Sequence, residues 1–388
     1  MHKVNLTAYN KLNLLECGQQ FFPALIAAID AAQAEVFLET YIFTLDPIGQ
    51  TVKAALERAA GRGVMVKVIA DWLGCGRAVS NQLAHDFKLA GVAFRSFNPW
   101  FRRGVARTHR KLCVVDHEVA FVGGINLIDD MVSDDYASLA LPAPRWDFAV
   151  RIEGPIVETI QREVELQWSR LGHLKLRARW RRFKSARTHL TPHSEAPVVA
   201  GLVVRDNLRN RRTIQRAYLQ ALAGAKESAV LANPYFAPGR KLRDALARAA
   251  QRGIDVTLLL GVGQFRIQDA VAHSFYPKLL KAGVKVVEYR KTQLHAKVAV
   301  VDDTWATVGS SNCDGLSLFV NQEANIVVRD AGFSKQLRQA IERATADGVV
   351  IDPDEFGHIR WYERAWHGAA YFLYQGVLRV ITLGKYTE

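Results

Sequence analysis

A chain of 388 residues is too long for one ordinary domain and long enough for two. Its hydrophobic share of 49% and charged share of 23% are close to the averages for folded proteins, which excludes disordered and fibrous classes. Lys and Arg outnumber Asp and Glu by 51 to 38, a net charge of +13, so the expected partners are anionic: nucleic acid, an acidic membrane surface or phosphorylated substrates.

The N-terminal region lacks the basic start and apolar core of a signal peptide. Its apolar run, residues 21–28, contains Pro23 and is closed by Asp30. No uncharged apolar stretch reaches the roughly 18 residues of a membrane span, so no transmembrane helix is expected. The cysteines lie far apart without a C-x-x-C pair, which favours a reducing compartment over disulfides or a zinc site. They are Cys17, Cys75, Cys113 and Cys313.

Short β-branched runs alternate with helical stretches along the first half of the chain. Two helices are expected to end at Gly63 and Gly91, where a left-handed cap suits glycine. The expected strands are 36–43, 64–70 and a hairpin of 112–115 with 120–123. This alternation is typical of an α/β fold whose sheet is covered on both faces.

The second half repeats the first. Residues 55–63, ALERAAGRG, match residues 245–253, ALARAAQRG, at an offset of 190. The expected strands follow in the same order, at 229–236, 254–260, 298–301 and 306–309. Charge and prolines interrupt the periodicity between the halves. We therefore expect four regions: a first domain at 1–172, a linker at 173–200, a second domain at 201–350 and a C-terminal segment at 351–388.

Each half carries the same rigidly spaced polar motif. It reads H-x-K-x4-D-x6-G-x2-N, and the spacing is identical in both copies. The motif residues are His109, Lys111, Asp116, Gly123 and Asn126 in the first half, and His295, Lys297, Asp302, Gly309 and Asn312 in the second. On a strand, positions i and i+2 face one side, so the imidazole and the ammonium of each copy project together. The aspartates fall on the other side or in the turn, and we assign them a supporting role.

Two such motifs, brought together around a pseudo-twofold axis, suit a phosphodiester. Lysine and asparagine donors stabilise the non-bridging oxygens and stand in for a metal, so no cofactor is expected. One imidazole attacks phosphorus, while the other protonates the leaving oxygen and then deprotonates an incoming hydroxyl. A nucleophilic imidazole needs a carboxylate on its second nitrogen. We predict that Asp147 pairs with one histidine and Glu323 with the other.

These residues resemble the duplicated motif of the phospholipase D superfamily. The segments 38–43, 121–126, 151–155, 305–312 and 323–325 are similar to those of bacterial cardiolipin synthases over nearly the whole chain. The resemblance implies two phospholipase D-like α/β/α sandwich domains with the active site at their interface. It also implies metal-independent transfer of a phosphatidyl group from phosphatidylglycerol to another phospholipid or alcohol, through a phosphatidyl-histidine.

The resemblance carries residue roles with it. His109 becomes the nucleophile and His295 the general acid and base, although the sequence alone leaves the assignment open. Asn126, Asn312 and Ser310 are expected to bind the phosphate. One departure is Gly124, which stands where the second copy has Ser310 and makes the two half-sites unequal.

Three further segments have more than one interpretation. Residues 170–187 hold eight Lys or Arg and no acid, which fits an anionic bilayer, a solvated linker or an RNA-binding patch. Residues 99–103 form a lipid-facing rim or a plain loop. Residues 365–378 carry no Asp, Glu, Lys or Arg and are rich in aromatics, typical of an in-plane membrane helix or a helix packed on the core. The expected location is the cytoplasmic face of the inner membrane, held peripherally.

Other functions remain compatible with the sequence. A nuclease of the same superfamily would use the same cavity, and a non-catalytic lipid-binding module would keep the fold, although both motifs are intact. The acceptor is open among phosphatidylglycerol, phosphatidylethanolamine, glycerol and water, and so is the oligomeric state. The histidines of the linker, which lack acidic or cysteine companions, are expected to face solvent. They are His173, His189 and His193.

Overall fold

The computed structural model describes residues 4–134, 139–172, 198–206 and 210–381. Most of the basic segment 170–187 and the three linker histidines lie outside these residues, as does the greater part of the linker 173–200. Within the described part, no helix is long and apolar enough to cross a membrane.

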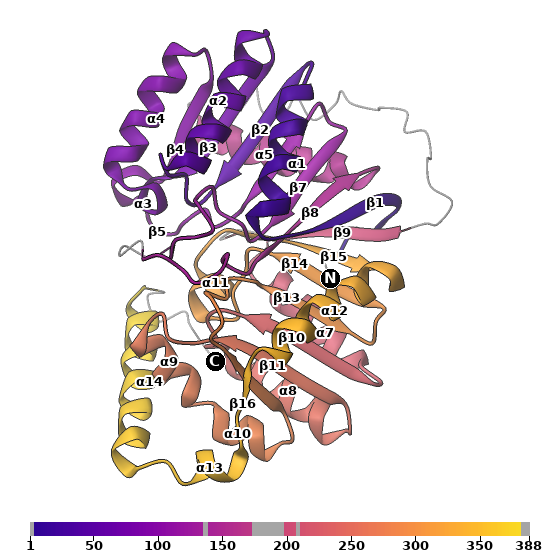
Figure 1. Ribbon diagram of the computed structural model, residues 1–388, viewed down its shortest axis with the longest axis vertical. Coiled ribbons are helices and arrows are strands. Elements are labelled where there is room, and N and C mark those ends of the chain that lie inside the picture. The colour runs from indigo at the N-terminus through magenta and orange to yellow at the C-terminus, as the bar shows by residue number, and fades with distance from the viewer. Residues whose placement is uncertain (1–3, 135–138, 173–197, 207–209, 382–388) are drawn as a thin grey trace.

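The two halves contribute matching strands (Figure 1). Those of the first half are β1 (Thr7–Glu16), β2 (Glu35–Thr40), β3 (Met65–Asp71), β4 (Ala93–Phe97), β5 (Arg102–Val105), β6 (Leu112–Val115), β7 (Val119–Gly123) and β8 (Phe148–Glu153). Those of the second are β9 (Val198–Arg205), β10 (Ser228–Asn233), β11 (Asp255–Gly261), β12 (Lys285–Tyr289), β13 (Val298–Val301), β14 (Trp305–Gly309), β15 (Glu323–Arg329) and β16 (Val349–Val350).

Helices follow the same duplication. The first half has α1 (Cys17–Ala31), α2 (Pro47–Gly61), α3 (Trp72–Cys75), α4 (Arg77–Leu89), the 3-10 turn η1 (Pro99–Phe101) and α5 (Ile156–Leu171). The second has α7 (Thr213–Gly224), α8 (Arg240–Gln251), α9 (Arg266–His273), α10 (Tyr276–Lys281), α11 (Gly315–Phe319), α12 (Ala331–Ala346), α13 (Pro353–Gly357) and α14 (Trp361–Ile381).

The strand order reads the same from either side of the middle. It runs β16-β12-β11-β10-β13-β14-β15-β9-β1-β8-β7-β6-β2-β3-β4, so β1 and β9 pair antiparallel at the centre and each half adds its strands outward in the same sequence, apart from β16, an extra edge strand of the second half. Figure 1 shows β1 and β9 side by side where the halves meet. The expected duplication about a pseudo-twofold axis is confirmed, and it forms one continuous sheet.

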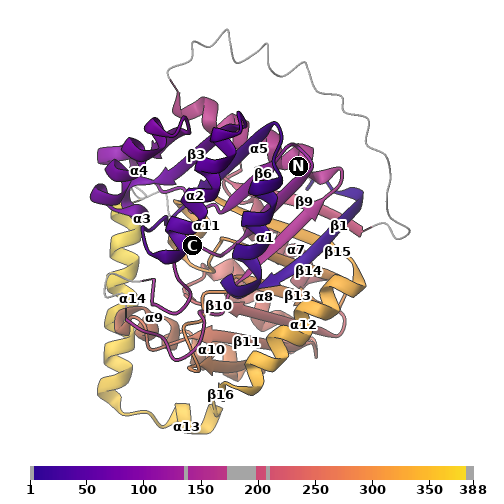
Figure 2. The same ribbon diagram turned by 45° about the horizontal axis from the view of Figure 1, so that its top comes forward.

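Three apolar cores hold the layers together. One lies between one face of the whole sheet and the helices α5 and α12, and it therefore spans both halves. The opposite face is covered separately, by α1, α2 and α4 in the first half and by α7, α8 and α10 in the second. Figure 2 shows α1, α2 and α4 together over their half of the sheet. The shared core fixes how the halves sit against each other, and so fixes any site between them.

The glycine caps are as expected. Gly63 and Gly253 both have φ of 88°, and Gly91 and Gly283 have φ of 77° and 89°, all in the left-handed region that favours glycine. Strand ends were less well predicted. The strand expected to run to residue 43 ends at Thr40, because the chain turns there and Phe43 forms only an isolated bridge with Leu127.

Candidate active site between the two halves

Both motif histidines lie just before a strand, not on it. β6 begins at Leu112 and β13 at Val298, as expected, so the histidine and the lysine of each motif precede the strand and the argument from alternating strand positions does not apply to them. Each histidine instead sits in an extended stretch that bridges to the other half. The backbone N–H of His109 donates to the carbonyl of Gln322 at 2.8 Å, and that of His295 donates to the carbonyl of Trp146 at 2.9 Å.

His109 is held by groups from the second half. Its Nδ1 lies 3.0 Å from Oε2 of Glu323 and 3.0 Å from the carbonyl oxygen of Ser310. Both partners accept, so Nδ1 carries the proton and Nε2 keeps its lone pair. The edge of the ring packs against Tyr41, with ring centroids 4.9 Å apart. A buried imidazole with a free lone pair and a carboxylate behind it is the arrangement of an activated nucleophile.

His295 is held by groups from the first half. Its Nδ1 lies 2.5 Å from Oδ2 of Asp147, and its Nε2 lies 3.2 Å from Oδ2 of Asp134. The predicted pairing of Asp147 with one histidine and Glu323 with the other is confirmed. The structure adds that each pair crosses between the halves, so neither half can orient its own imidazole alone.

The two lysines complete a single charge cluster. Nζ of Lys111 donates to the carbonyl of His109 at 2.8 Å, and Nζ of Lys297 donates to the carbonyl of His295. Burial, with the neighbouring Lys297, lowers the pKa of Lys111 to about 7, and burial lowers the pKa of Lys297 to about 8. Two desolvated ammonium groups that repel each other are electrostatically prepared for a phosphodiester anion.

Burial and the neighbouring charges also shift the pKa values of the two imidazoles. Burial lowers the pKa of His109, with Glu323 acting in the opposite direction. Burial and then Lys297 lower the pKa of His295 to about 4, while Asp134 and Asp147 oppose that shift. Burial therefore favours the neutral form of both imidazoles, which is the form that a nucleophile requires.

The two asparagines are buried near the motifs. Oδ1 of Asn126 lies 3.4 Å from the backbone nitrogen of Ile42 and accepts from it. Oδ1 of Asn312 is buried and has no hydrogen-bond partner among the described residues. An amide oxygen only accepts hydrogen bonds, so this unpaired atom can take a donor group of a ligand, whereas a phosphate oxygen would have to be bound by the amide N–H of Asn312.

Ser310 was expected to bind the phosphate, but its hydroxyl is hydrogen-bonded within the protein. Its hydroxyl donates to Oε2 of Glu323 at 2.5 Å and accepts from the backbone N–H of Ala324 at 3.1 Å, so it is not available to a phosphate. In the other half a Cβ on Gly124 would lie 2.4 Å from Oδ1 of Asp147. The absent side chain there makes room for the carboxylate. The two half-sites therefore differ: one pairs Ser310 with Glu323, and the other places Gly124 against Asp147.

Asp116 and Asp302 are not among the reacting groups. Both lie in the hairpin turn at the far end of β6 or β13, with φ of 51° and 52°. Asp116 accepts from three backbone N–H groups, at residues 33, 34 and 35, over 2.7 to 2.8 Å. Asp302 does the same at residues 226, 227 and 228. Their supporting role is structural, because they tie the hairpin to the start of β2 or β10.

We expect Asp116→Ala to destabilise the protein without impairing the chemistry. Losing three amide acceptors and placing alanine at a positive φ should lower the free energy of unfolding by about 1–3 kcal/mol. Urea denaturation measures this loss, and turnover per folded molecule should stay within about twofold of the unchanged protein. Asp116→Asn, which keeps one acceptor oxygen and tolerates the left-handed region, should lose less. A large loss of turnover in a fully folded Asp116→Ala protein would contradict the assignment.

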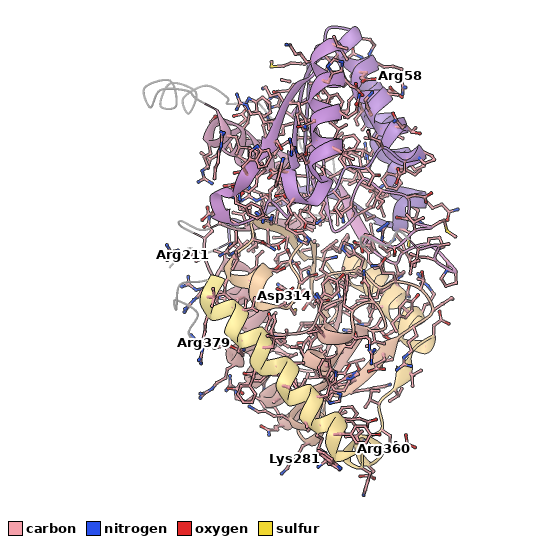
Figure 3. All side chains as sticks on the ribbon, turned by 90° about the vertical axis from the view of Figure 1, so that its left-hand side faces the viewer. Arg58, Arg211, Lys281, Asp314, Arg360 and Arg379 are labelled. Atoms are coloured by element: carbon pink, nitrogen blue, oxygen red, sulfur yellow. The ribbon has the colours of Figure 1, made fainter. Side chains whose placement is uncertain are left out.

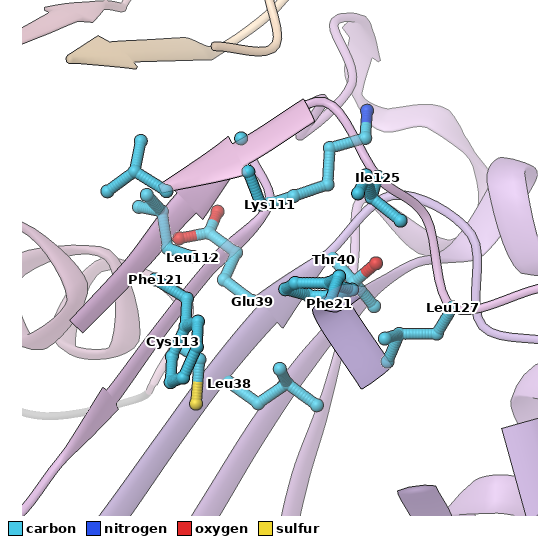
Figure 4. Close-up of a pocket in the computed structure, with 13 residues that line it drawn as sticks. Phe21, Leu38, Glu39, Thr40, Lys111, Leu112, Cys113, Phe121, Ile125 and Leu127 are labelled. Atoms are coloured by element: carbon cyan, nitrogen blue, oxygen red, sulfur yellow. The ribbon is translucent and has the colours of Figure 1, made fainter. Parts of the chain in front are cut away.

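A small internal void beneath the site has no room for a substrate. Its volume is about 10 Å³, room for at most one water molecule, and its wall is mainly apolar, with Phe21, Leu38 and Phe121 among its members. Figure 4 shows the Lys111 stem at this wall with its ammonium group pointing away from the apolar side chains. The void belongs to the packing under the motif, and Lys111 is part of its wall.

Sequence reasoning missed one group at the centre of the site. Asp134 belongs to no repeat and lies in an irregular loop, yet it is within ion-pair distance of His295. The sequence offers only a weak signal, an aspartate eight residues beyond the motif asparagine with no counterpart in the second half.

Comparison with known proteins agrees with this geometry. The family model described as "Cardiolipin synthase, PLD-like domain" matches residues 25–142 and 218–345, one match in each half. Cardiolipin synthase B of Escherichia coli K12 is 42% identical over 361 residues, covering 91% of this chain and 85% of that protein. Cardiolipin synthase B of Salmonella typhi is 41% identical, covering 88% of this chain and 81% of its own length.

A solved structure shares the fold. Phosphatidylserine synthase of Haemophilus influenzae Rd KW20 superposes with a TM-score of 0.71 at 14% identity, covering 98% of this chain and 97% of that one. The duplicated sheet and paired motifs define a phospholipase D-like protein. Within that class, the chain belongs to the cardiolipin synthase family of PLD-like domain proteins.

Proposed function

We propose that the protein is a phosphatidyltransferase of the cardiolipin synthase type. One observation carries the proposal: two histidine–lysine pairs meet between the halves, and each imidazole is oriented by a carboxylate of the opposite half. The 42% identity to cardiolipin synthase B supports the same substrate class, phosphatidylglycerol and related phospholipids.

The first displacement uses His109 as the nucleophile. Its Nε2 attacks the phosphorus of phosphatidylglycerol, a nitrogen–phosphorus bond forms, and the bond to the headgroup oxygen breaks. His295 delivers its Nε2 proton to that oxygen, and glycerol leaves. Lys111, Lys297 and the Asn312 amide stabilise the charge on the non-bridging oxygens, and Glu323 stabilises the positive charge that develops on His109.

The second displacement returns the enzyme to its starting state. His295, now neutral, takes the proton of an acceptor hydroxyl, whose oxygen attacks phosphorus and expels His109. Two in-line displacements leave the configuration at phosphorus unchanged. With phosphatidylglycerol as the acceptor, the product is cardiolipin.

Lipid mass spectrometry tests the proposal directly. The protein is incubated with phosphatidylglycerol vesicles and a panel of labelled alcohols, and separately with labelled DNA. We expect cardiolipin or a labelled phosphatidyl-alcohol, lost in the His295→Gln variant. Cleaved DNA without a lipid product would identify the nuclease alternative, and lipid binding without any product would identify a non-catalytic module.

The helix α14 supports a peripheral place on a membrane. One of its faces packs on the protein, where Leu378 is fully buried and the Tyr374 hydroxyl accepts from the backbone N–H of Gly315 at 2.7 Å. The opposite face leaves Phe372, Leu373 and Val380 exposed at 74%, 58% and 76%. Figure 3 shows α14 lying along the surface with Arg360 and Arg379 near its two ends. An apolar stripe with cationic flanks suits the headgroup boundary of an anionic bilayer.

Vesicle sedimentation measures this contact. The double variant Phe372→Ser with Leu373→Ser should bind phosphatidylglycerol vesicles at least roughly tenfold more weakly, because each aromatic or aliphatic side chain withdrawn from the bilayer loses more than about 1 kcal/mol. The matched control is Met65→Ser with Leu89→Ser, two exposed apolar residues on the first half, at 54% and 76%. Equal loss in both variants would contradict a role for α14.

The proposed location is the cytoplasmic face of the inner membrane. All four cysteines are free thiols, three of them buried, which supports a reducing compartment. The proposed partners are phosphatidylglycerol and other phospholipids on an anionic surface, in keeping with the net charge of +13.

A further inference from the structure

The outer nitrogen of His295 faces a buried carboxylate that the phosphoryl-transfer scheme does not use. Oδ2 of Asp134 lies 3.2 Å from Nε2 of His295, and the side chains of both residues are at most 7% exposed. Nε2 is the atom that must donate to the leaving oxygen. Asp134 therefore occupies the position next to Nε2 that the leaving oxygen of the substrate needs, so the carboxylate and the substrate oxygen cannot both contact Nε2.

Asp134 is fixed in this position by its surroundings. Its other oxygen, Oδ1, accepts from the side-chain amides of Gln293 at 2.5 Å and Gln264 at 3.1 Å. Its backbone N–H donates to Oε1 of Gln293 at 3.2 Å, and Nη1 of Arg145 lies 3.8 Å from Oδ2. Gln264 is itself held by the Tyr235 hydroxyl at 2.9 Å. A carboxylate held from several elements is a built feature of the site.

The two histidines differ in this respect. Both have a carboxylate on Nδ1, but of these two histidines only His295 also has one on the Nε2 side among the described residues. An oxygen anion 3.2 Å away is attracted by an N–H and repelled by a lone pair. Asp134 therefore favours the form of His295 that carries a proton on Nε2, and nothing comparable favours it at His109.

We propose that Asp134 is the positioning residue that loads His295 with the proton for the first displacement, and thereby makes His295 the acid and leaves His109 as the nucleophile. The inference rests on the proposed phosphatidyl transfer. In the empty site Asp134 stabilises the protonated imidazole. When the phosphodiester enters, the headgroup oxygen replaces Asp134 at Nε2 and receives that proton as its bond to phosphorus breaks.

Several charged groups around His295 affect the pH at which its imidazole loses a proton. Asp134 and Asp147 stabilise its protonated form, while Lys297 and burial oppose it. Lys111, Glu323 and Arg145 act one step away, on Lys297 or on Asp134 itself. Removing the charge of Asp134 removes one of the two influences that keep the proton on His295, so the imidazole should lose its proton at a lower pH.

The test is the pH profile of kcat and KM for transfer from phosphatidylglycerol, measured from pH 4 to 9 on the full chain. In Asp134→Asn the alkaline limb of kcat should move down by roughly one pH unit or more, because a carboxylate at contact distance changes a pKa by about that much. At the acidic end kcat should recover to within a few-fold of the unchanged protein. KM should not rise, since the displaced anion competes with the substrate.

Two further variants keep the outcome interpretable. Asp129→Asn makes the same change in the same loop, at a carboxylate that accepts from the backbone N–H of Met131 at 2.9 Å, and its profile should not move. Gln264→Leu loosens Asp134 without removing its charge, and should give a smaller shift in the same direction. If Asp134→Asn lowers kcat equally at every pH, or changes nothing, Asp134 has no such role.

The two proposals fail in different ways. If the unchanged protein forms no lipid product, the phosphatidyl transfer itself is wrong. If it forms product, His295→Gln does not, and the Asp134→Asn profile stays in place, only the role of Asp134 is overturned.

Discussion

The His109→Gln variant should lose at least roughly 10³-fold in kcat, because glutamine keeps much of the polarity of the side chain but has no nitrogen lone pair to attack phosphorus. No phosphatidyl-histidine should form on this variant, whereas His295→Gln should still form some of it and fail to release it. Acid-quenched protein analysed by mass spectrometry distinguishes the two variants by a phosphatidyl adduct on residue 109.

The matched control for this variant is His117→Gln. His117 lies in the hairpin turn beside Asp116, where its Nε2 is 3.2 Å from Glu35 and far along β6 from the motif lysine. It should keep its turnover to within about twofold. An adduct on residue 295 in place of residue 109 would exchange the roles of the two histidines, and with them the role given to Asp134.

The second large effect is expected at Glu323. Its Oε2 accepts from Nδ1 of His109 and from the Ser310 hydroxyl, and it reaches the imidazole from the opposite half. In Glu323→Gln the charge that stabilises a positively charged His109 is lost, and kcat should fall by roughly 10²-fold to 10³-fold. The carbonyl of Ser310 still accepts from Nδ1, which keeps part of the correct tautomer and places the loss below that of His109→Gln.

KM separates this positioning role from substrate binding. Glu323 lies behind the imidazole, so KM for phosphatidylglycerol should stay within about twofold while kcat falls. Ser310→Ala should lower kcat by only about tenfold, because it removes one donor to Glu323 and leaves the carbonyl in place. A rise in KM for Ser310→Ala with unchanged kcat would instead return Ser310 to the phosphate.

Much of the site could be predicted because its residues occur as a motif repeated in the two halves of the sequence. Identical spacing of histidine, lysine and asparagine in two copies requires both copies to occupy equivalent places, whatever the details of the strands. The pairing with Asp147 and Glu323 followed from a chemical need, since an attacking imidazole requires an acceptor on its second nitrogen. Even so, the sequence could not say that each carboxylate serves the other half.

The motif aspartates were expected in a supporting role, and the structure places them in the hairpin turns, where they accept from backbone N–H groups. The errors fall where local pattern and tertiary contact diverge. Ser310 has the chemistry of a phosphate ligand, yet its hydroxyl is satisfied inside the protein by Glu323. Asp134 was missed because it lies in an irregular loop and has no counterpart in the second half, so no repeated pattern marks it as a partner of His295.

The sequence by itself determined the duplication, the α/β alternation, the left-handed glycine caps and the residue types of the two motifs, because each depends on local spacing and backbone preference. Only the tertiary structure decided which carboxylate holds which histidine and what the difference between Gly124 and Ser310 does, since Ser310 donates to Glu323 and Gly124 makes room for Asp147. Those contacts form across the β1–β9 junction, where the shared core sets how two distant stretches of chain meet. Local sequence encodes the parts, but their juxtaposition comes from the packing of one half against the other.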